Sequence, residues 1–298
     1  MKQVTRHMTQ KRHTMAMDKA KDSGKNDTSF WDRNRGAIRT RKGGLVISQG
    51  VVYSHGYRLL EDLMGKISYF QLLVLNATGR LPERPLADWL EASFFCISYP
   101  DARIWCNHIG SLGGTMQATP IASNCAGLLA TDSRLYGPLA VVNSARFITS
   151  ALALKKTGMA VEEIVETLPR RRPDGTLMIP GFNRPVATGD ERIPLLEKLT
   201  QKLGFESGAH LELAYAIESV TSSKYNEFMN SGGYRAAFLS DQGFSDQEIY
   251  RILSIYMNAG ITACFTEAAE HRGESFYPLR CDDIDYRGKP PRALPDGD

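Results

Sequence analysis

Apolar residues recur at helical spacing along most of this chain, and this periodicity restricts the fold more than any other feature. Short β-branched runs occur only at residues 45–47 and 50–53. After them, apolar residues return every three or four positions, which is the spacing of the buried face of an amphipathic helix. The pattern predicts a mainly α-helical protein whose strand signals are confined to the region near residue 50.

Start and stop signals divide the helical region into segments. One helical stretch is predicted over residues 59–75, because a glycine and then a proline follow at residues 79–82. Gly204 is expected to close a leucine-striped helix, and Ser245 with Glu248 forms the capping-box pattern of a helix start. A further helix, with Pro85 in its first turn, should carry the apolar residues Leu86, Trp89, Leu90, Phe94 and Phe95.

Length and composition fit a soluble globular protein. A chain of 298 residues can form one large domain or two domains that share a core. Apolar residues make up 42% of it, and no run of about 18 apolar residues exists. We therefore expect no membrane span.

The positive charge is concentrated in the first 43 residues. This segment has twelve Lys or Arg and four Asp, a net charge of +8, which leaves −5 for the remaining 255 residues. It lacks the apolar core of a secretion signal, so residues 1–43 are predicted to be a basic, disordered tail. Because the excess charge lies in this tail, no nucleic-acid partner is predicted for the folded body.

The cysteines indicate a reducing compartment. Their number is odd, and they form neither a CxxC pair nor the spacing of a metal site. Without a secretion signal, we expect free thiols in a cytoplasmic protein and no metal centre. The five are Cys96, Cys106, Cys125, Cys264 and Cys281.

The most distinctive motif is MIPGFNRPVATGDER, at residues 178–192. It resembles the PGFGHPxYxxGDPRA loop of the citrate synthase family. Other segments resemble further motifs of that family, in the same order and at similar spacing. They are residues 50–62 (GVVYSHGYRLLED), 79–82 (GRLP), 135–139 (LYGPL), 230–244 (NSGGYRAAFLSDQGF), 260–267 (GITACFTE) and 284–291 (IDYRGKPP).

The resemblance implies an all-α, citrate-synthase-like fold that assembles as an intertwined homodimer without a membrane partner. It places residues 44–145 and 244–298 in a large helical domain and residues 146–243 in a smaller one, with a cleft that closes around ligand. It also implies a small-molecule substrate and a coenzyme A thioester as co-substrate, with no covalently bound cofactor. The implied chemistry forms or cleaves a carbon–carbon bond between an acyl-CoA and a 2-oxo acid.

The catalytic residues implied by the resemblance are replaced in this chain. The two histidines fall on Ala140 and Arg184, and the aspartate falls on Gly232. A further histidine falls on Cys264, and an arginine that binds substrate carboxylate falls on Met257. Another matched position, Arg192, keeps the arginine of the G-D-P-R motif. The resemblance thus implies the fold together with a divergent active site.

Candidate site residues follow from this comparison and from the chemistry of the side chains. Arg184 and Arg192 could clamp a carboxylate or phosphate, since guanidinium groups bind such anions in a bidentate manner. Glu227 is the nearest carboxylate to Gly232 along the chain and could replace the missing base, although a glutamate on a helix surface is the alternative. The candidates are Arg184, Asn183, Glu227 and His108 for catalysis, Arg192 and Arg184 for substrate, and Ile179, Pro180, Gly181, Phe182 and Arg172 for coenzyme A.

Two hypotheses about function stay open at this point. The first is an acyl-CoA-dependent enzyme with rearranged active-site residues. The second is a catalytically inactive relative that binds a ligand or a partner subunit. A separate segment, residues 110–127, is dense in Gly, Ala, Ser and Thr, which favours close helix packing at a dimer seam over a ligand site.

Overall fold

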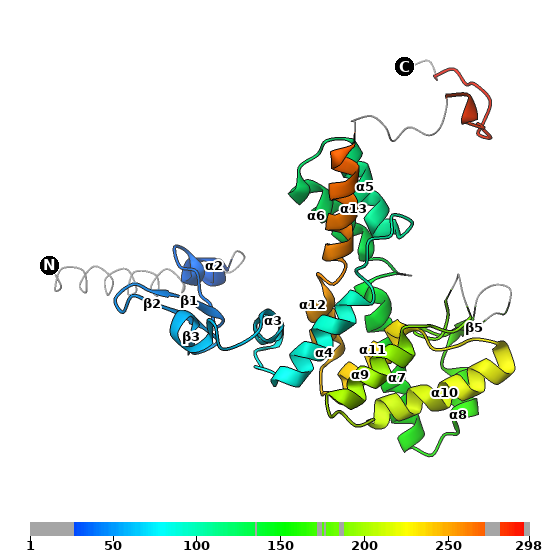
Figure 1. The fold of residues 1–298 in the computed structure, drawn as a ribbon, viewed down its shortest axis with the longest axis horizontal. Coiled ribbons are helices and arrows are strands. Elements are labelled where there is room, and N and C mark those ends of the chain that lie inside the picture. Colours follow the sequence, from blue (N-terminus) through cyan, green and yellow to red (C-terminus); the bar gives the residue numbers. More distant parts are fainter. Residues whose placement is uncertain are drawn as a thin grey trace. The chain divides into compact units, whose positions relative to one another are not determined.

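A computed structural model describes residues 27–134, 136–171, 175, 177–184, 188–271 and 281–294 of the chain (Figure 1). The chain divides into two compact units, and the boundary falls between Lys66 and Ile67. We describe each unit by itself. Residues 1–26 of the predicted basic tail and Arg172 of the predicted coenzyme A site lie outside the described residues.

The first unit contains a small antiparallel sheet. Its strands lie in the order β1-β2-β3, with Val46 opposite Val51 and Tyr53 opposite Arg58. The strands predicted at residues 45–47 and 50–53 are thereby confirmed. His55 and Gly56 join β2 to β3 with positive φ angles of 49° and 87°, as a type I′ hairpin turn requires. The elements are α2 (Ser29–Asn34), β1 (Gly43–Val46), β2 (Val51–Ser54), β3 (Tyr57–Arg58) and the π-helical turn η1 (Leu59–Leu63).

The single helix predicted over residues 59–75 is wrong. The structure divides this stretch into η1 and a separate helix, α3 (Tyr69–Thr78). Gly65 between them has a φ of +73°, which an α-helix does not accommodate. Ser68 then starts α3 through a capping box with Gln71, at hydrogen bonds of 3.0 and 3.2 Å. Apolar periodicity therefore continues across a break that local capping imposes.

Other boundaries follow the sequence signals. Helix α4 (Arg84–Phe95) has Pro85 in its first turn, and α12 (Asp246–Leu253) is capped by the Ser245–Glu248 box. Helix α9 (Ile193–Lys202) ends before Gly204, whose φ is +80°. Phe95 is the exception in α4, because 70% of it is exposed while Trp89 and Leu90 are buried.

Helices α5 (Trp105–Thr115), α6 (Pro120–Thr131) and α13 (Asn258–Glu270) pack together as a three-helix bundle (Figure 1). Glycines allow their backbones to approach. A Cβ atom at Gly110 would lie 2.8 Å from the Ile261 carbonyl oxygen, and one at Gly127 would lie 2.8 Å from the Ile261 side chain. Residues 110–127 therefore pack closely within this bundle, and their predicted place at a dimer seam stays a prediction.

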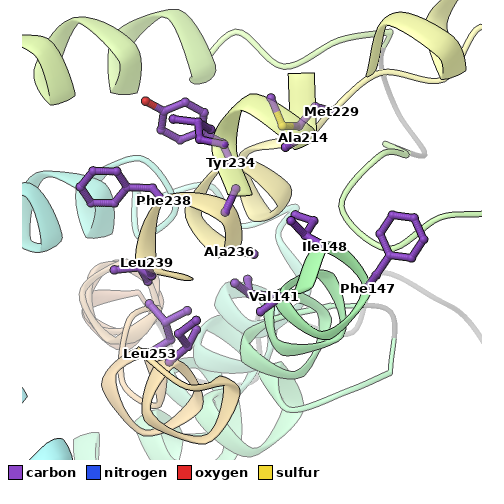
Figure 2. Packing of buried hydrophobic residues seen from close by; sticks show 14 of the residues in the cluster. Val141, Phe147, Ile148, Ala214, Met229, Tyr234, Ala236, Phe238, Leu239 and Leu253 are labelled. Atoms are coloured by element: carbon purple, nitrogen blue, oxygen red, sulfur yellow. The ribbon is translucent and has the colours of Figure 1, made fainter. Parts of the chain in front are cut away.

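The main core lies where α7 (Pro138–Lys156) packs against α11 (Ser231–Asp241), with α10 (Ala209–Tyr225) and α12 beside them (Figure 2). Phe238 of α11 stacks on Trp89 of α4, and the Tyr234 hydroxyl lies 3.0 Å from Thr200 Oγ1 of α9, whereas Ile148 of α7 lies on the other side of α11. Helices α3 and α4 continue the core, since α3 packs on α12 and α9 packs on α4. The remaining elements are α8 (Val161–Thr167), the two-stranded β4 (Arg170–Arg171) and β5 (Leu177–Met178), and the 3-10 turn η2 (Cys281–Asp283).

The described residues are thus mainly α-helical, with short strands only in the β1–β3 sheet and the β4–β5 pair. Among them, no helix combines the length and the apolar sequence needed to cross a bilayer. The thiols of Cys96, Cys106, Cys125 and Cys264 are free. The division into a large domain and a small domain, with boundaries at residues 146 and 244, stays a prediction.

Candidate active site

The loop that follows β5 is anchored by its apolar side chains. Ile179 and Phe182 belong to the hydrophobic core, and the Phe182 ring makes an edge contact with Phe147 of α7. Gly181 has a φ of +87°, and a Cβ atom there would lie 2.8 Å from Gly233 Cα and 3.0 Å from Ser144 Oγ. Only glycine fits this backbone conformation and this space. The loop backbone therefore lies directly against α7 and α11.

A single side chain, Asn230, ties this loop to the start of α11. Its Oδ1 accepts hydrogen bonds from the backbone amides of Gly232 and Gly233, at 2.9 and 3.0 Å, and so caps the helix. Its Nδ2 donates to the Asn183 carbonyl at 2.7 Å, and its own amide donates to the Gly181 carbonyl at 2.8 Å. The position of the loop is therefore fixed by the helix cap.

Three segments meet at this point: the start of α7, the loop and the start of α11. A Cβ atom at Gly232 would lie 3.6 Å from Val141 Cγ2, so the first turn of α11 faces the first turn of α7. These are the segments that carry Ala140, Arg184 and Gly232, the positions where the resemblance implies catalytic residues. The structure brings the segments together, and the chain has other side chains at these positions.

Two predicted catalytic residues are in direct contact. Asn183 Nδ2 donates a hydrogen bond of 2.7 Å to Glu227 Oε1, across 44 positions of the sequence. Glu227 is half-buried and follows Asn226, whose φ of 53° ends α10 in the left-handed conformation. Thr221 Oγ1 donates to the Glu227 carbonyl at 2.8 Å, which fixes the backbone of this turn. The carboxylate is thus held beside the loop.

Arg184 pairs with Glu191 rather than projecting freely from the loop. Both of its terminal nitrogens donate to the Glu191 carboxylate, and Nη1 lies 3.9 Å from Asp190 Oδ1. The hydrogen bond to Glu191 raises the pKa of Arg184 above its ordinary value. The Arg184 side chain is 19% exposed, so part of it remains accessible to solvent.

Arg192 forms a bidentate ion pair with Asp190, whose side chain is fully buried. Its Nε and Nη2 donate at 2.7 and 2.6 Å, and the Ser231 amide at the start of α11 donates to Asp190 Oδ2 at 2.7 Å. Burial by itself would raise the pKa of Asp190, but the hydrogen bonds and charge of Arg192 and the Ser231 amide lower it to about 2. Asp190 therefore stays ionised, and Arg192 is held at a defined orientation.

Arg235 is a site-proximal residue that the motif comparison missed. It lies one turn into α11 and is 1% exposed, and Nη1 donates to the Ser231 carbonyl at 2.9 Å. The only signal in the sequence is a lone basic residue inside the apolar run 234–239, at a position where the family motif has an apolar residue. Arg235 also affects Tyr256, since its charge opposes the rise in the pKa of Tyr256 that burial causes.

The remaining predicted site residues are placed differently. His108 lies on the exposed surface of α5, whose packing partners are α6 and α13, so it is not among the residues gathered around the loop. Pro180 is half-buried within the loop, and the Phe182 amide donates to the Ile179 carbonyl at 3.1 Å to close the turn. Because the Ile179 and Phe182 side chains are in the core, main-chain atoms are what these positions offer a ligand.

No protein-family model matches the sequence, and comparison with curated protein sequences finds no match. Comparison with solved structures does find matches. Citryl-CoA lyase from Hydrogenobacter thermophilus superimposes with a TM-score of 0.72 at 24% identity, over 87% of this chain and 97% of that one. The chain has the citrate synthase fold.

Two other solved structures share this citrate synthase fold. ATP citrate lyase from Methanothrix soehngenii, in complex with citrate and coenzyme A, aligns with a TM-score of 0.70 at 18% identity, over 90% of this chain. The alignment covers 45% of the lyase chain, so this protein corresponds to less than half of that enzyme. Citrate synthase from Thermoplasma acidophilum, in a complex with carboxymethyl coenzyme A and oxaloacetate, gives a TM-score of 0.57 at 17% identity, over 77% of this chain and 59% of that one.

These likenesses confirm the predicted fold, namely an all-α, citrate-synthase-like architecture. At identities below 25% they show the fold alone, and one fold can carry different chemistries. The side chains of this chain therefore have to support any statement about its reaction.

Proposed function

We propose that the protein is a cytoplasmic, coenzyme A thioester-dependent enzyme that forms or cleaves a carbon–carbon bond. Its second substrate is a carboxylate-bearing molecule of the 2-oxo acid type. The observation that carries this proposal is the meeting of the loop with the first turns of α7 and α11, beside a carboxylate held by Asn183. The citrate synthase fold supports it, since the solved structures with this fold include complexes with coenzyme A.

Glu227 acts as the base in this proposal. In the direction of synthesis, its carboxylate takes a proton from the carbon next to the thioester, and that carbon then attacks the carbonyl carbon of the 2-oxo acid. The carbonyl oxygen becomes a hydroxyl by taking up a proton, and a new carbon–carbon bond is formed. In the direction of cleavage the same steps run backwards. Asn183 orients the carboxylate through the 2.7 Å hydrogen bond and is a positioning residue.

Arg192 recognises the carboxylate of the second substrate. Asp190 occupies its Nε and Nη2 atoms, and Nη1 forms no hydrogen bond within the part of the chain that the structure describes. Its side chain is 21% exposed, so this third nitrogen is available to an anion. Arg184, which pairs with Glu191 at the surface, adds a second positive charge that attracts the same substrate carboxylate.

We also propose that the protein functions as a homodimer. The support is the outward face of α6, where neutral, mostly apolar side chains are exposed at helical spacing. An exposed apolar patch of this kind marks an interaction surface. Replacing Leu129 with glutamate should convert the dimer to a monomer in light scattering, whereas a monomeric wild-type protein would contradict the proposal. The face comprises Ile121, Ala122, Cys125, Ala126 and Leu129.

The alternative is a catalytically inactive protein that binds coenzyme A or a partner subunit. It is favoured by the side chains at three positions, because Ala140, Gly232 and the buried Cys264 offer no acid or base of ordinary strength at pH 7. Burial also raises the pKa of the Cys264 thiol, which makes the thiolate scarce.

One experiment separates the two functions. The purified protein is incubated with acetyl-CoA or propionyl-CoA and a panel of 2-oxo acids, while thermal unfolding, free thiol and new acyl-CoA adducts are followed by calorimetry, a thiol reagent and mass spectrometry. The enzyme predicts an adduct or thiol release that needs both substrates. A thermal shift without either product supports the binding protein, and the absence of all three signals contradicts any coenzyme A ligand.

A further inference from the structure

Arg235 is a fully buried cation whose hydrogen bonds are incomplete. Nη1 donates to the Ser231 carbonyl at 2.9 Å, and Nη2 donates to the Ser93 carbonyl at the end of α4 at 3.1 Å. Its Nε–H is buried and has no acceptor among the described residues. A buried donor without a partner is costly, so its retention calls for a physical reason.

The charge of Arg235 is also unbalanced. The described residues give it no ion pair, and the nearby Asp190 carboxylate is already held by two nitrogens of Arg192 and by the Ser231 amide. Arg192 and Arg235 each carry a charge of +1 and Asp190 carries −1, so these three side chains together have a net charge of +1. Burial lowers the pKa of Arg235 to about 10, and at neutral pH the group stays charged.

A continuous set of hydrogen bonds links the two arginines. Arg192 donates to Asp190, Asp190 accepts from the Ser231 amide, and the Ser231 carbonyl accepts from Arg235. Both guanidinium groups are thus oriented through the same pair of residues, Asp190 and Ser231. Because Ser231 is the first residue of α11, this set belongs to the meeting point of the loop and the helix.

We infer that Arg235 is a specificity-determining residue, whose buried positive charge makes the site bind a carboxylate ligand rather than its uncharged analogue. The ligand carboxylate neutralises the excess charge of the Arg192–Asp190–Arg235 cluster, in which Arg192 makes the direct contact. This inference rests on the proposed function for the location of the ligand. It is independent of whether a carbon–carbon bond is formed.

A purely structural role for Arg235 makes the opposite prediction about affinity. In that role the guanidinium only joins α11 to α4 through its hydrogen bond to the Ser93 carbonyl. A neutral side chain of similar length would then weaken the fold and leave ligand affinity unchanged. In the inferred role, Arg235→Met removes a buried charge that lacks an ion pair. Such a replacement is often neutral or stabilising for the unliganded protein.

The test measures binding of pyruvate, oxaloacetate and malonate to the full chain by titration calorimetry, with dimethyl malonate as the uncharged probe. Arg235→Met is expected to weaken binding of whichever carboxylate binds best by roughly tenfold or more, since a buried positive charge near the ligand is lost. Arg84→Met is the matched control, because Arg84 is an exposed arginine paired with Asp88 on α4. This control should bind like the wild type.

Several outcomes overturn the inference: wild-type protein that binds none of the three carboxylates, equal affinity for dimethyl malonate, or unchanged affinity in Arg235→Met. If Arg235→Met does not fold, Arg235→Gln replaces it, and a carboxylate affinity equal to that of the wild type then overturns the inference. Carboxylate binding that depends on Arg235, without any reaction on acyl-CoA, would refute the proposed enzyme and leave this inference standing.

Discussion

The α5–α6–α13 bundle and the α7–α11 meeting point solve two different packing problems. In the bundle, glycines bring helix backbones into contact, and the buried side chains at the contacts are neutral. At the start of α11, glycines also allow close approach, but the buried groups there include Asp190 and Arg235. The first region depends on shape, whereas the second combines shape with charges that are costly to bury.

The difference indicates where function lies. Close packing of neutral helices stabilises the fold without a ligand, because each contact removes apolar surface from water. Charges are costly to bury, so their presence at a loop–helix junction points to ligand binding. Substitutions in the two regions should therefore differ in kind as well as in size.

The largest loss of stability is expected in the neutral bundle. A Cβ atom at Gly114 would lie 2.8 Å from the Ala268 Cβ and the Ala269 nitrogen, and closer still to the carbonyl oxygen of Phe265. Because two of these atoms are backbone of α13, relief requires a shift of the whole helix. We expect Gly114→Ala to lower the free energy of unfolding by about 3 kcal/mol in urea denaturation.

Gly44 is the matched control for this substitution. No other atom lies within 4 Å of the position that an added Cβ would take, and its φ is not positive, so Gly44→Ala should leave the urea midpoint nearly unchanged. Equal midpoints for both variants would show that the bundle is loosely packed, and the contrast between the two regions would then fail.

A smaller and pH-dependent loss is expected at the charged junction. The pKa of Asp190 is about 2 in the folded protein and close to 3.8 in the unfolded chain. A lowered folded-state pKa contributes stability above pH 4 that disappears as the pH falls towards 2, here roughly 2 kcal/mol. Asp190→Asn should lose this amount at pH 7 and should lack that part of the acid dependence.

Denaturation of wild type and Asp190→Asn at several pH values between 2 and 7 measures this effect. The difference in the free energy of unfolding between the two proteins should become smaller as the pH falls. A difference that is constant across this range would mean that the ionisation of Asp190 does not stabilise the junction.

The smallest effect on stability is expected at the helix cap that holds the loop. Asn230→Ala removes the oxygen that caps α11 and the donor to Asn183, which should cost about 1 kcal/mol. Asn230→Asp keeps the capping oxygen but loses the donor, so it should be nearly as stable as the wild type. Both variants should weaken binding of acetyl-CoA in titration calorimetry, since both release the loop. If both variants bound acetyl-CoA as tightly as the wild type, the loop would not be part of the ligand site.

The sequence predicted those features that depend on local signals. The capping box at Ser245 and the proline start of α4 are confirmed. The glycine-dense α5–α6 segment packs closely as expected, and its place at a dimer seam stays a prediction. The predicted helix over residues 59–75 failed because Gly65 and the cap at Ser68 override a continuous apolar period.

The candidate site was predictable only in part. The motif at residues 178–192 located the loop, but the contact of Asn183 with Glu227 joins segments 44 positions apart and depends on the end of α10. The hydrogen bonds of the buried Arg235 go to the carbonyls of Ser231 and Ser93, and of these the Ser93 carbonyl lies 142 positions away, so the sequence shows only a lone basic residue inside an apolar run. Long-range contacts of this kind are set by packing rather than by local propensity.

The most direct test of the account is proton exchange at the carbon next to the thioester. Acetyl-CoA is incubated in D₂O with wild-type protein or with Glu227→Gln, in the presence of each 2-oxo acid, and deuterium in the methyl group is measured by mass spectrometry. Exchange is expected with the wild type, and exchange at least roughly 100-fold slower is expected with Glu227→Gln, while acetyl-CoA still binds. Equal rates for the two proteins, or no exchange above buffer with wild-type protein that binds acetyl-CoA, would contradict it.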